Sequence, residues 1–223
     1  MRVILFGATG MVGQGVLREC LLADDVAQVL VVGRTPSGVN HPKLREIVQA
    51  DLFEYGAVEE QLRDYDACFF TLGVSAGGMD EAGYTRITHD LTLSAAHVLV
   101  RLNPAMTFVY VSGAGTDDSE RGRAMWARVK GRTENALKRL PFKAVYLLRP
   151  GAIQPLHGAR SSTRAYRWLY TAMAPVLPLL RRWFPHSLAT TETMGKAMLA
   201  LARHGWPESV LAARDIEEAS RHG

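Results

Sequence analysis

Several features that would assign this chain of 223 residues to a well-marked class of protein are scarce in it. There are only two cysteines, Cys20 and Cys68, which are too few for a disulfide framework. No stretch reaches the 18 or more apolar residues of a membrane-spanning helix. The first residues carry no signal-peptide cleavage pattern. From these absences we expect a reduced, cytoplasmic protein without a transmembrane segment.

Three kinds of catalytic signature are missing as well. The seven histidines lack metal-ligand spacing, so we expect no zinc or iron site. The sequence contains no Gly-x-Ser-x-Gly elbow. It also contains no Walker loop for binding nucleoside triphosphates. Hydrolases and nucleoside triphosphatases that depend on these motifs are therefore excluded.

What is present is the composition of an ordinary globular protein, with an uneven distribution of charge. Residues 1–120 carry 8 basic and 16 acidic side chains, whereas residues 121–182 carry 14 basic ones against the single carboxylate of Glu134. Such a basic block suggests an anionic partner, whether a phosphorylated cofactor, an acidic substrate, a membrane surface or nucleic acid. A solvated, arginine-rich surface is an equal alternative. We do not expect a nucleic-acid partner, and a peripheral membrane contact stays open.

Short apolar runs alternate with helical patterns along the first 150 residues. The expected strands are Arg2–Phe6, Ala27–Val32, Leu44–Gln49, Ala67–Leu72, Thr107–Val111 and Lys143–Leu148. The expected helices are Met11–Ala23, Ala57–Arg63, Glu81–Leu102, Arg121–Leu140, Thr191–His204 and Asp215–Arg221. This alternation predicts an α/β fold with a Rossmann-type, doubly wound parallel sheet. We expect one domain over 1–223, with a dinucleotide-binding core at 1–151 and a small cap with C-terminal helices at 152–223.

A glycine-rich turn directly follows the first predicted strand. Gly7, Gly10 and Gly13 have the spacing GxxGxxG and open the first helix. Such glycines permit a tight turn, a close approach of the backbone to a pyrophosphate, and close packing of helix on strand. The helix N-terminus offers free N–H groups to phosphates. The motif predicts a dinucleotide site whose contacts come from Gly7, Thr9, Gly10, Met11, Val12 and Gly13.

The end of the second strand favours one dinucleotide over the other. An NAD site usually places a carboxylate there, but this sequence has Arg34 and Thr35 instead. Because arginine pairs well with a 2′-phosphate, we expect NADP(H), with NAD as the weaker alternative. The ends of the next two strands supply further candidate contacts, namely Asp51, Leu52, Leu72, Gly73 and Val74. Ordinary turn chemistry is the alternative for these residues.

These motifs, together with Val111-Ser112-Gly113, Val129-Lys130-Gly131 and Leu148-Arg149-Pro150-Gly151, resemble an atypical short-chain dehydrogenase/reductase. The chain is similar in particular to small NAD(P)-binding proteins related to the HIV Tat-interacting protein 2 and to epimerase/dehydratase relatives. The resemblance covers residues 1–155. It implies that Ser112 orients a substrate oxygen and that Lys130 binds the nicotinamide ribose. It also implies that Pro150, Gly151 and Ile153 lie along the nicotinamide.

One expected catalytic group is absent. The family places a tyrosine four residues before its lysine, where this chain has Trp126. An indole N–H donates a hydrogen bond but cannot deliver a proton near neutral pH. Tyr166 or Tyr170 from the cap, or water, would then supply the proton. Alternatively, the protein binds NADP(H) without turnover, as a redox sensor or scaffold.

The segment from 161 to 184 is apolar and flanked by arginines. Core packing, a lid over an apolar substrate, an oligomer interface and a membrane-surface contact are all compatible with it. We expect an NADP(H)-dependent oxidoreductase for a small, largely apolar carbonyl or alcohol compound. A homo-oligomer remains an open alternative to a monomer.

Overall fold

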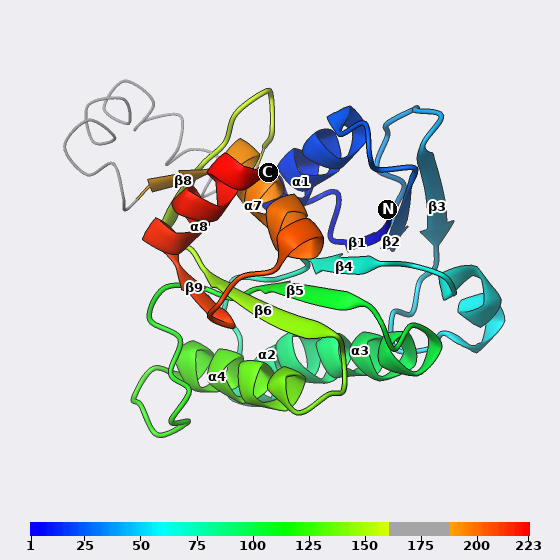
Figure 1. Ribbon diagram of the computed structural model, residues 1–223. Helices are drawn as coiled ribbons and strands as arrows, with labels where there is room; N and C mark the ends of the chain where they lie inside the picture. Colours follow the sequence, from blue (N-terminus) through cyan, green and yellow to red (C-terminus); the bar gives the residue numbers. More distant parts are fainter. Residues whose placement is uncertain (161–187) are drawn as a thin grey trace.

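A seven-stranded parallel sheet forms the centre of the molecule in the computed structural model, which describes residues 1–160 and 188–223 (Figure 1). The strand order is β3-β2-β1-β4-β5-β6-β9. The strands are β1 (Arg2–Phe6), β2 (Gln28–Gly33), β3 (Leu44–Val48), β4 (Ala67–Phe70), β5 (Thr107–Val111), β6 (Ala144–Arg149) and β9 (Val210–Ala212). The predicted doubly wound α/β fold is therefore confirmed. Because the order reverses between β1 and β4, a ligand crevice is expected at the carboxyl edge there.

Strand β1 explains why both faces of the sheet are buried. Its residues Val3 to Phe6 are all 0% exposed, and they pair with β2 on one side and β4 on the other. Successive side chains of a strand point to opposite faces. Val3 and Leu5 accordingly join the apolar cluster on one face, and Ile4 and Phe6 join the cluster on the other. A strand of this kind is apolar throughout, as parallel sheets require.

Helices cover both faces of the sheet (Figure 1). One face carries α1 (Met11–Leu22), α7 (Thr191–His204) and α8 (Ala213–Ala219). The other carries α2 (Glu81–Thr85), α3 (Leu91–Leu102) and α4 (Met125–Lys138). Between α2 and α3 the chain forms a π-helical turn, η2 (Arg86–Asp90), so the predicted helix 81–102 is continuous but locally widened, with hydrogen bonds that span five residues instead of four. On the first face, a β-carbon on Gly15 of α1 would lie 2.5 Å from the β-carbon of Thr191, so α1 and α7 cross in direct backbone contact.

The structure differs from the predicted elements in three places. The segment predicted as a helix at 57–63 is the 3-10 helix η1 (Gly56–Leu62). Helix α4 starts only at Met125, because Asp117 accepts a hydrogen bond from the Gly122 N–H and holds residues 117–122 in a loop. Three short strands were not predicted: β9, and the pair β7 (Ala152–Gln154) and β8 (Leu188–Thr190). Each has three residues, which is too short for a recognisable period.

No helix within residues 1–160 and 188–223 has both the length and the apolar character needed to cross a membrane.

Candidate functional site

A pocket of about 580 Å³ opens at the carboxyl edge of the sheet, where the strand order reverses. It includes ten of the predicted site residues: Gly7, Thr9, Gly10, Arg34, Thr35, Asp51, Leu52, Leu72, Gly73 and Val74. These residues follow four different strands, β1, β2, β3 and β4. The structure thus brings together, in one cavity, side chains that lie far apart in the sequence.

The glycine-rich turn after β1 forms the floor of this pocket. Gly7 has φ +84°, a left-handed conformation that glycine adopts without strain, and its carbonyl accepts a hydrogen bond of 2.9 Å from the Gly10 N–H. Gly10 is the N-cap residue of α1 and makes no side-chain cap. The free N–H groups of the first turn of α1 therefore face the end of β1, where the positive end of the helix dipole favours an anion.

The loop after β2 brings a positive charge to the pocket. Arg34 and Thr35 are exposed and line the cavity. Within the described ranges Arg34 forms no ion pair, so its guanidinium group is available to an anionic ligand. The chain offers no carboxylate at this position, since Gly33 is followed by Arg34, Thr35 and Pro36.

An aromatic residue that the sequence analysis missed lines the pocket beyond the end of β3. Phe53 lines the cavity two residues after Asp51, whose Oδ1 accepts a hydrogen bond of 2.8 Å from the Phe53 N–H. The guanidinium carbon of Arg86 lies 4.8 Å from the centre of the Phe53 ring. The stacked arginine fixes this ring at the wall of the pocket. No spacing in the sequence connects residue 53 with residue 86.

The π-helical turn supplies the apolar side of the pocket. Ile87 and Leu91, four residues apart across η2 and the start of α3, both line the cavity. They belong to the segment 81–102 that was predicted as a helix, and the structure shows that one side of it borders the pocket. π-Helical turns are rare and occur frequently at functional sites. The remaining lining residues that were not predicted are Ala8, Val31, Gly33, Ala50 and Thr71.

The glycine at position 73 fits a site that receives a ligand. Gly73 lines the pocket after β4, and a β-carbon built on it would meet no protein atom within 4 Å. Internal packing therefore does not require glycine at this position. Open space at the end of a strand, next to the glycine-rich turn and Arg34, is what a phosphorylated nucleotide needs. The residues present thus fit a dinucleotide.

A second set of predicted residues gathers at the ends of β5 and β6. Ser112 follows β5 and is 7% exposed, and its Oγ lies 2.9 Å from Oγ1 of Thr116. Thr116 donates its own proton to the carbonyl of Gly113, so Ser112 is the donor between the two hydroxyl groups. The Lys130 ammonium group donates to the carbonyl of Ser112 at 3.2 Å. Ser112 and Lys130 are therefore neighbours, as the resemblance implied.

Lys130 has an unusual environment for a lysine. Its Nζ lies 5.4 Å from the ring centre of Tyr110 and also approaches the carbonyl of Val111 at 3.5 Å. Burial lowers the pKa of Lys130 to about 8, and the Glu134 carboxylate partly opposes this change. A lysine in this state switches between charged and neutral forms close to physiological pH.

Trp126 stands on α4 four residues before Lys130. A β-carbon on Gly115 would lie 3.3 Å from the outer edge of the Trp126 ring, so the indole packs against the loop that follows β5. Tyr166 and Tyr170, the alternative proton donors considered from the sequence, lie outside the described residues.

The other predicted contact residues lie outside the pocket. Met11 and Val12 form the first turn of α1 and pack against the apolar cluster beneath that helix. Pro150 is buried, and its carbonyl accepts a hydrogen bond of 2.8 Å from the Ala114 N–H. Gly151 is exposed, whereas the Ile153 side chain is packed in the apolar core. Of these segments, Pro150 and Gly151 lie nearest to the end of β5.

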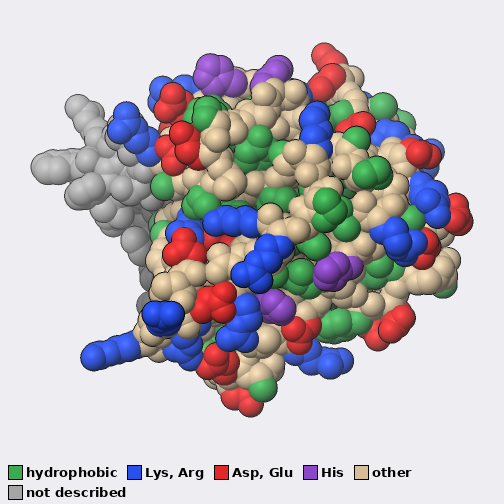
Figure 2. Space-filling model, turned by 60° about the horizontal axis from the view of Figure 1, so that its bottom comes forward, with side chains coloured by type: hydrophobic (Ala, Val, Ile, Leu, Met, Phe, Trp, Pro, Cys, Tyr) green, Lys and Arg blue, Asp and Glu red, His purple; other side chains and the backbone are tan. Residues whose placement is uncertain are grey.

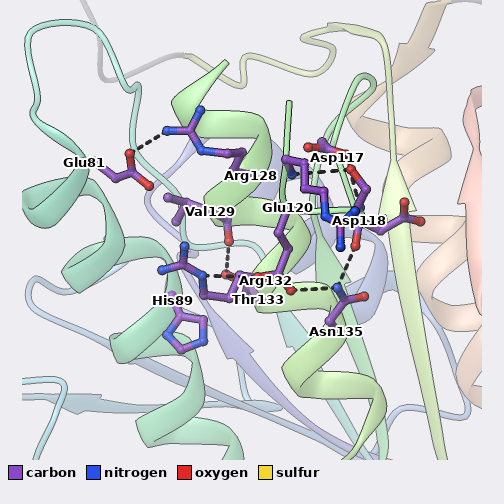
Figure 3. A network of polar contacts seen from close by, with 12 residues as sticks. Glu81, His89, Asp117, Asp118, Glu120, Arg128, Val129, Arg132, Thr133 and Asn135 are labelled. Atoms are coloured by element: carbon purple, nitrogen blue, oxygen red, sulfur yellow. Dashed lines mark hydrogen bonds and ion pairs between the residues drawn. The ribbon is translucent and has the colours of Figure 1, made fainter. Parts of the chain in front are cut away.

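Arginines of the basic block have carboxylate partners in the part of the chain that the structure describes. On α4, Arg128 pairs with Glu81 at 2.6 Å and Arg132 pairs with Glu120 at 3.5 Å. Figure 3 shows these side chains between α2 and the 117–120 loop, with Asn135 bonded to Glu120. On the face that carries α2, α3 and α4, basic and acidic side chains are intermingled (Figure 2). Three arginines of the block, Arg128, Arg132 and Arg149, are thus paired with carboxylates in the described part of the chain.

Comparisons with known proteins agree with this site. The profile of the family described as NAD(P)H-binding matches residues 7–154. The protein fmp52-2, mitochondrial, of Aspergillus oryzae is 29% identical over 153 residues, covering 67% of this chain and 66% of that protein. The fmp52 protein, mitochondrial, of Emericella nidulans is 31% identical over 169 residues, covering 73% and 70%. The aligned part thus spans slightly under two thirds of the length of the first relative.

Solved structures share the fold. The Bordetella bronchiseptica enzyme WbmF in complex with NAD+ has a TM-score of 0.69 at 18% identity, with 97% of this chain and 76% of that chain covered. The YIR035C short-chain dehydrogenase/reductase of Saccharomyces cerevisiae has a TM-score of 0.64 at 14% identity, with 96% of each chain covered. At these identities the likeness shows the Rossmann fold alone.

The comparisons also correct one expectation. A cytoplasmic protein was expected from the lack of a targeting pattern, whereas the matching fungal relatives are named mitochondrial proteins. The expectation is therefore wrong, because the absence of a signal-peptide pattern does not distinguish the cytoplasm from an organelle. With the glycine-rich turn, the pocket and the matched profile in agreement, the chain belongs to the NAD(P)H-binding family, with Fmp52 proteins among its relatives.

Proposed function

We propose that this chain binds NADP(H) at the carboxyl edge of its sheet and acts as an atypical short-chain oxidoreductase. Its substrate is a small, largely apolar carbonyl or alcohol compound. The observation that carries the proposal is the single pocket that joins the glycine-rich turn after β1 to Arg34 and Thr35 after β2. The pyrophosphate would lie at the N-terminus of α1, and the adenosine between Arg34, Asp51 and Phe53.

The charge of Arg34 supports the choice of NADP(H) over NAD(H). A guanidinium group binds a phosphate through short, charge-assisted hydrogen bonds. The hydroxyl of Thr35 is a second donor beside it. A site selective for NAD would carry a carboxylate at this strand end to accept hydrogen bonds from the ribose.

When bound, the nicotinamide supplies the hydride chemistry. The chain would contribute Ser112, which orients the substrate oxygen, and the Lys130 ammonium, which holds the nicotinamide ribose. Pro150, Gly151 and Ala152, the three residues that follow β6, would border the nicotinamide ring. The apolar surfaces of Ile87 and Leu91 lie on the adenosine side, so the substrate chamber would be closed by other segments of the chain.

A second function is favoured by Trp126. Because an indole cannot act as the general acid, a chain with tryptophan in the tyrosine position suits an NADP(H)-binding redox sensor or scaffold. The presence of both Ser112 and Lys130, the serine and lysine that the resemblance implies, speaks for catalysis, and Lys130 contacts the backbone carbonyl of Ser112. A carbonyl-substrate screen with NADPH separates the two functions.

The test of cofactor choice is a parallel fluorescence titration with NADPH and NADH on the wild-type chain, Arg34→Ala and Arg139→Ala. Arg139 is a matched control, because it is exposed at the C-terminal end of α4, away from the pocket. We expect Arg34→Ala to weaken NADPH binding by about 10- to 100-fold, the value of one charge-assisted contact. Binding of NADH should change little, and Arg139→Ala should behave like the wild type. If the wild-type chain binds neither dinucleotide, the proposal is wrong.

A further inference from the structure

Glu134 is fully buried although it is the one acidic residue of the basic block 121–182. Both oxygens of its carboxylate are held by Arg149, with Nε to Oε1 at 3.1 Å and Nη2 to Oε2 at 2.5 Å. Arg149 also contacts Asp118 at 3.3 Å. A carboxylate removed from water costs several kcal/mol unless it is paired in good geometry, so a bidentate arginine is the partner expected here.

The pair connects the elements that surround the nicotinamide side of the site. Glu134 belongs to α4, and Arg149 is the last residue of β6, directly before Pro150 and Gly151. Pro150 in turn accepts the hydrogen bond from Ala114, in the loop after β5. The ion pair therefore sets the position of α4 relative to the ends of both strands.

Glu134 also lies one turn after Lys130 on the same helix. Two titratable groups lie near Lys130: Glu134 on its own helix and Tyr110 on β5. Arg149 of β6 binds Glu134 and Asp118, and Tyr84 of α2 neighbours Tyr110. Burial raises the pKa of Tyr110 and Tyr84, so both phenols are neutral. Asp118 is turned to Arg149 at the surface. Among the described residues, the Glu134 carboxylate is the group that favours the charged form of Lys130.

We propose that Glu134 is a positioning residue for the nicotinamide half of the site. Through Arg149 it fixes the end of β6 against α4, and through its charge it keeps the Lys130 ammonium group available to the ribose of the cofactor. This inference rests on the proposed NADP(H)-binding function. It adds a carboxylate that touches neither cofactor nor substrate but acts through Lys130.

The alternative is that the ion pair only stabilises the fold. A double variant separates the two roles, because replacing both members of a buried pair by neutral side chains leaves no unpaired charge. Glu134→Gln alone should lower the melting temperature, since Arg149 then loses its bidentate partner and keeps only the contact with Asp118 at the surface. Glu134→Gln with Arg149→Met should recover much of that stability while still lacking the carboxylate.

The protonation of Lys130 can be read without any cofactor. The chain has five lysines, Lys43, Lys130, Lys138, Lys143 and Lys196, so carbon-13 NMR of labelled lysine ε-carbons resolves each titration. In the wild type we expect half of Lys130 to be protonated near pH 8. In Glu134→Gln the pKa of Lys130 should be lower, so that less than half is protonated at that pH, and in the double variant, which also loses the positive charge of Arg149, the decrease should be smaller. The control is Glu120→Gln, which removes a surface carboxylate that pairs with Arg132 of α4. It should leave the pKa of Lys130 unchanged.

A titration with NADPH at several pH values gives the second readout. Binding to the wild type should weaken as the pH rises through about 8, and in the double variant this weakening should occur at lower pH. If Lys130 titrates at the wild-type pH in both variants while NADPH still binds, the role of Glu134 is refuted and the pair is only structural. If the wild-type chain binds no dinucleotide, the proposed function fails first, independently of the NMR result.

Discussion

The carbonyl oxygen of Gly7 lies 2.0 Å from the point at which a β-carbon would stand on Gly13. Any side chain at position 13 would therefore collide with the backbone of the turn that leaves β1. Only glycine lets α1 start this close to the strand, and that closeness directs the N-terminus of α1 at the pocket. The third glycine of the motif thus shapes the site without lining it.

Gly13→Ala tests this relationship. We expect a loss of at least about 2 kcal/mol in the free energy of unfolding, because an added methyl group has no space and the backbone must shift. The shift should also weaken dinucleotide binding. Urea unfolding measures the first effect. Gly56→Ala is the control, since a β-carbon there meets nothing within 4 Å, and it should change stability by less than about 0.5 kcal/mol. If Gly13→Ala and the wild type unfold at the same urea concentration, the inferred collision of a side chain at position 13 with the Gly7 backbone is contradicted.

The pKa of Lys130 predicts how stability depends on pH. Burial lowers this pKa from 10.5 to about 8, so between these pH values the unfolded chain holds a proton that the folded chain has lost. The contribution of Lys130 to the free energy of unfolding therefore increases as the pH rises from about 8 to 10.5. Compared with Lys130→Met, which cannot titrate, the wild type should gain roughly 3 kcal/mol over that range.

Denaturant unfolding of both proteins at pH 7, 8, 9 and 10 measures this difference. Below pH 8 the free energies of unfolding of the two proteins should depend on pH in the same way, because Lys130 is then protonated in both the folded and the unfolded wild type. A difference that stays constant up to pH 10 would show that Lys130 is solvated and that its pKa is normal.

Trp126→Tyr tests whether one missing group separates this site from a working reductase. The variant places a phenol four residues before Lys130, where a lysine that is charged near neutral pH can lower the phenol pKa. We expect NADPH oxidation with a generic dicarbonyl probe to rise by at least about tenfold, a part of the 10²–10⁴-fold that a positioned general acid contributes. NADPH affinity should stay unchanged.

Trp126→Phe is the matched control, because it opens similar space near Gly115 but provides no proton. A rise in both variants would indicate better substrate access instead of acid catalysis. No rise in either would mean that Ser112 and Lys130 do not face a reacting carbonyl.

The sheet could be predicted from the sequence because its strands are short, continuous apolar runs between helical patterns. β1 and β5 were predicted with the bounds they have in the structure. β9 could not be, since three residues carry no period and its place beside β6 is decided by tertiary packing. The π-helical turn at Arg86–Asp90 was missed for a similar reason, because one extra residue in a turn leaves the apolar spacing almost unchanged.

Ten residues that line the pocket were predictable because each follows a strand, and parallel strands end at one edge. The positions of Phe53 and Ile87 at the pocket, and the stacking of Arg86 on Phe53, depend on which loop packs against which helix. Local sequence does not encode that packing. Glu134 did leave a signal. Glu134 is the only carboxylate in the block 121–182, which has 14 basic residues, and it lies on a helix with a core-facing side. This pattern points to a buried ion pair, although the partner, Arg149, could not have been named in advance.

The direct crossing of α1 and α7 at Gly15 and Thr191 has a consequence for how the chain is made. Helix α1 leaves the ribosome early, but the helix that covers its apolar side is translated only after most of the protein. Until then the nascent chain displays an uncovered half of its core, and β9 cannot yet extend the sheet. The matched region 7–154 therefore lacks the helix that completes this face of the core, and apolar surface left uncovered in this way makes a nascent chain prone to aggregation.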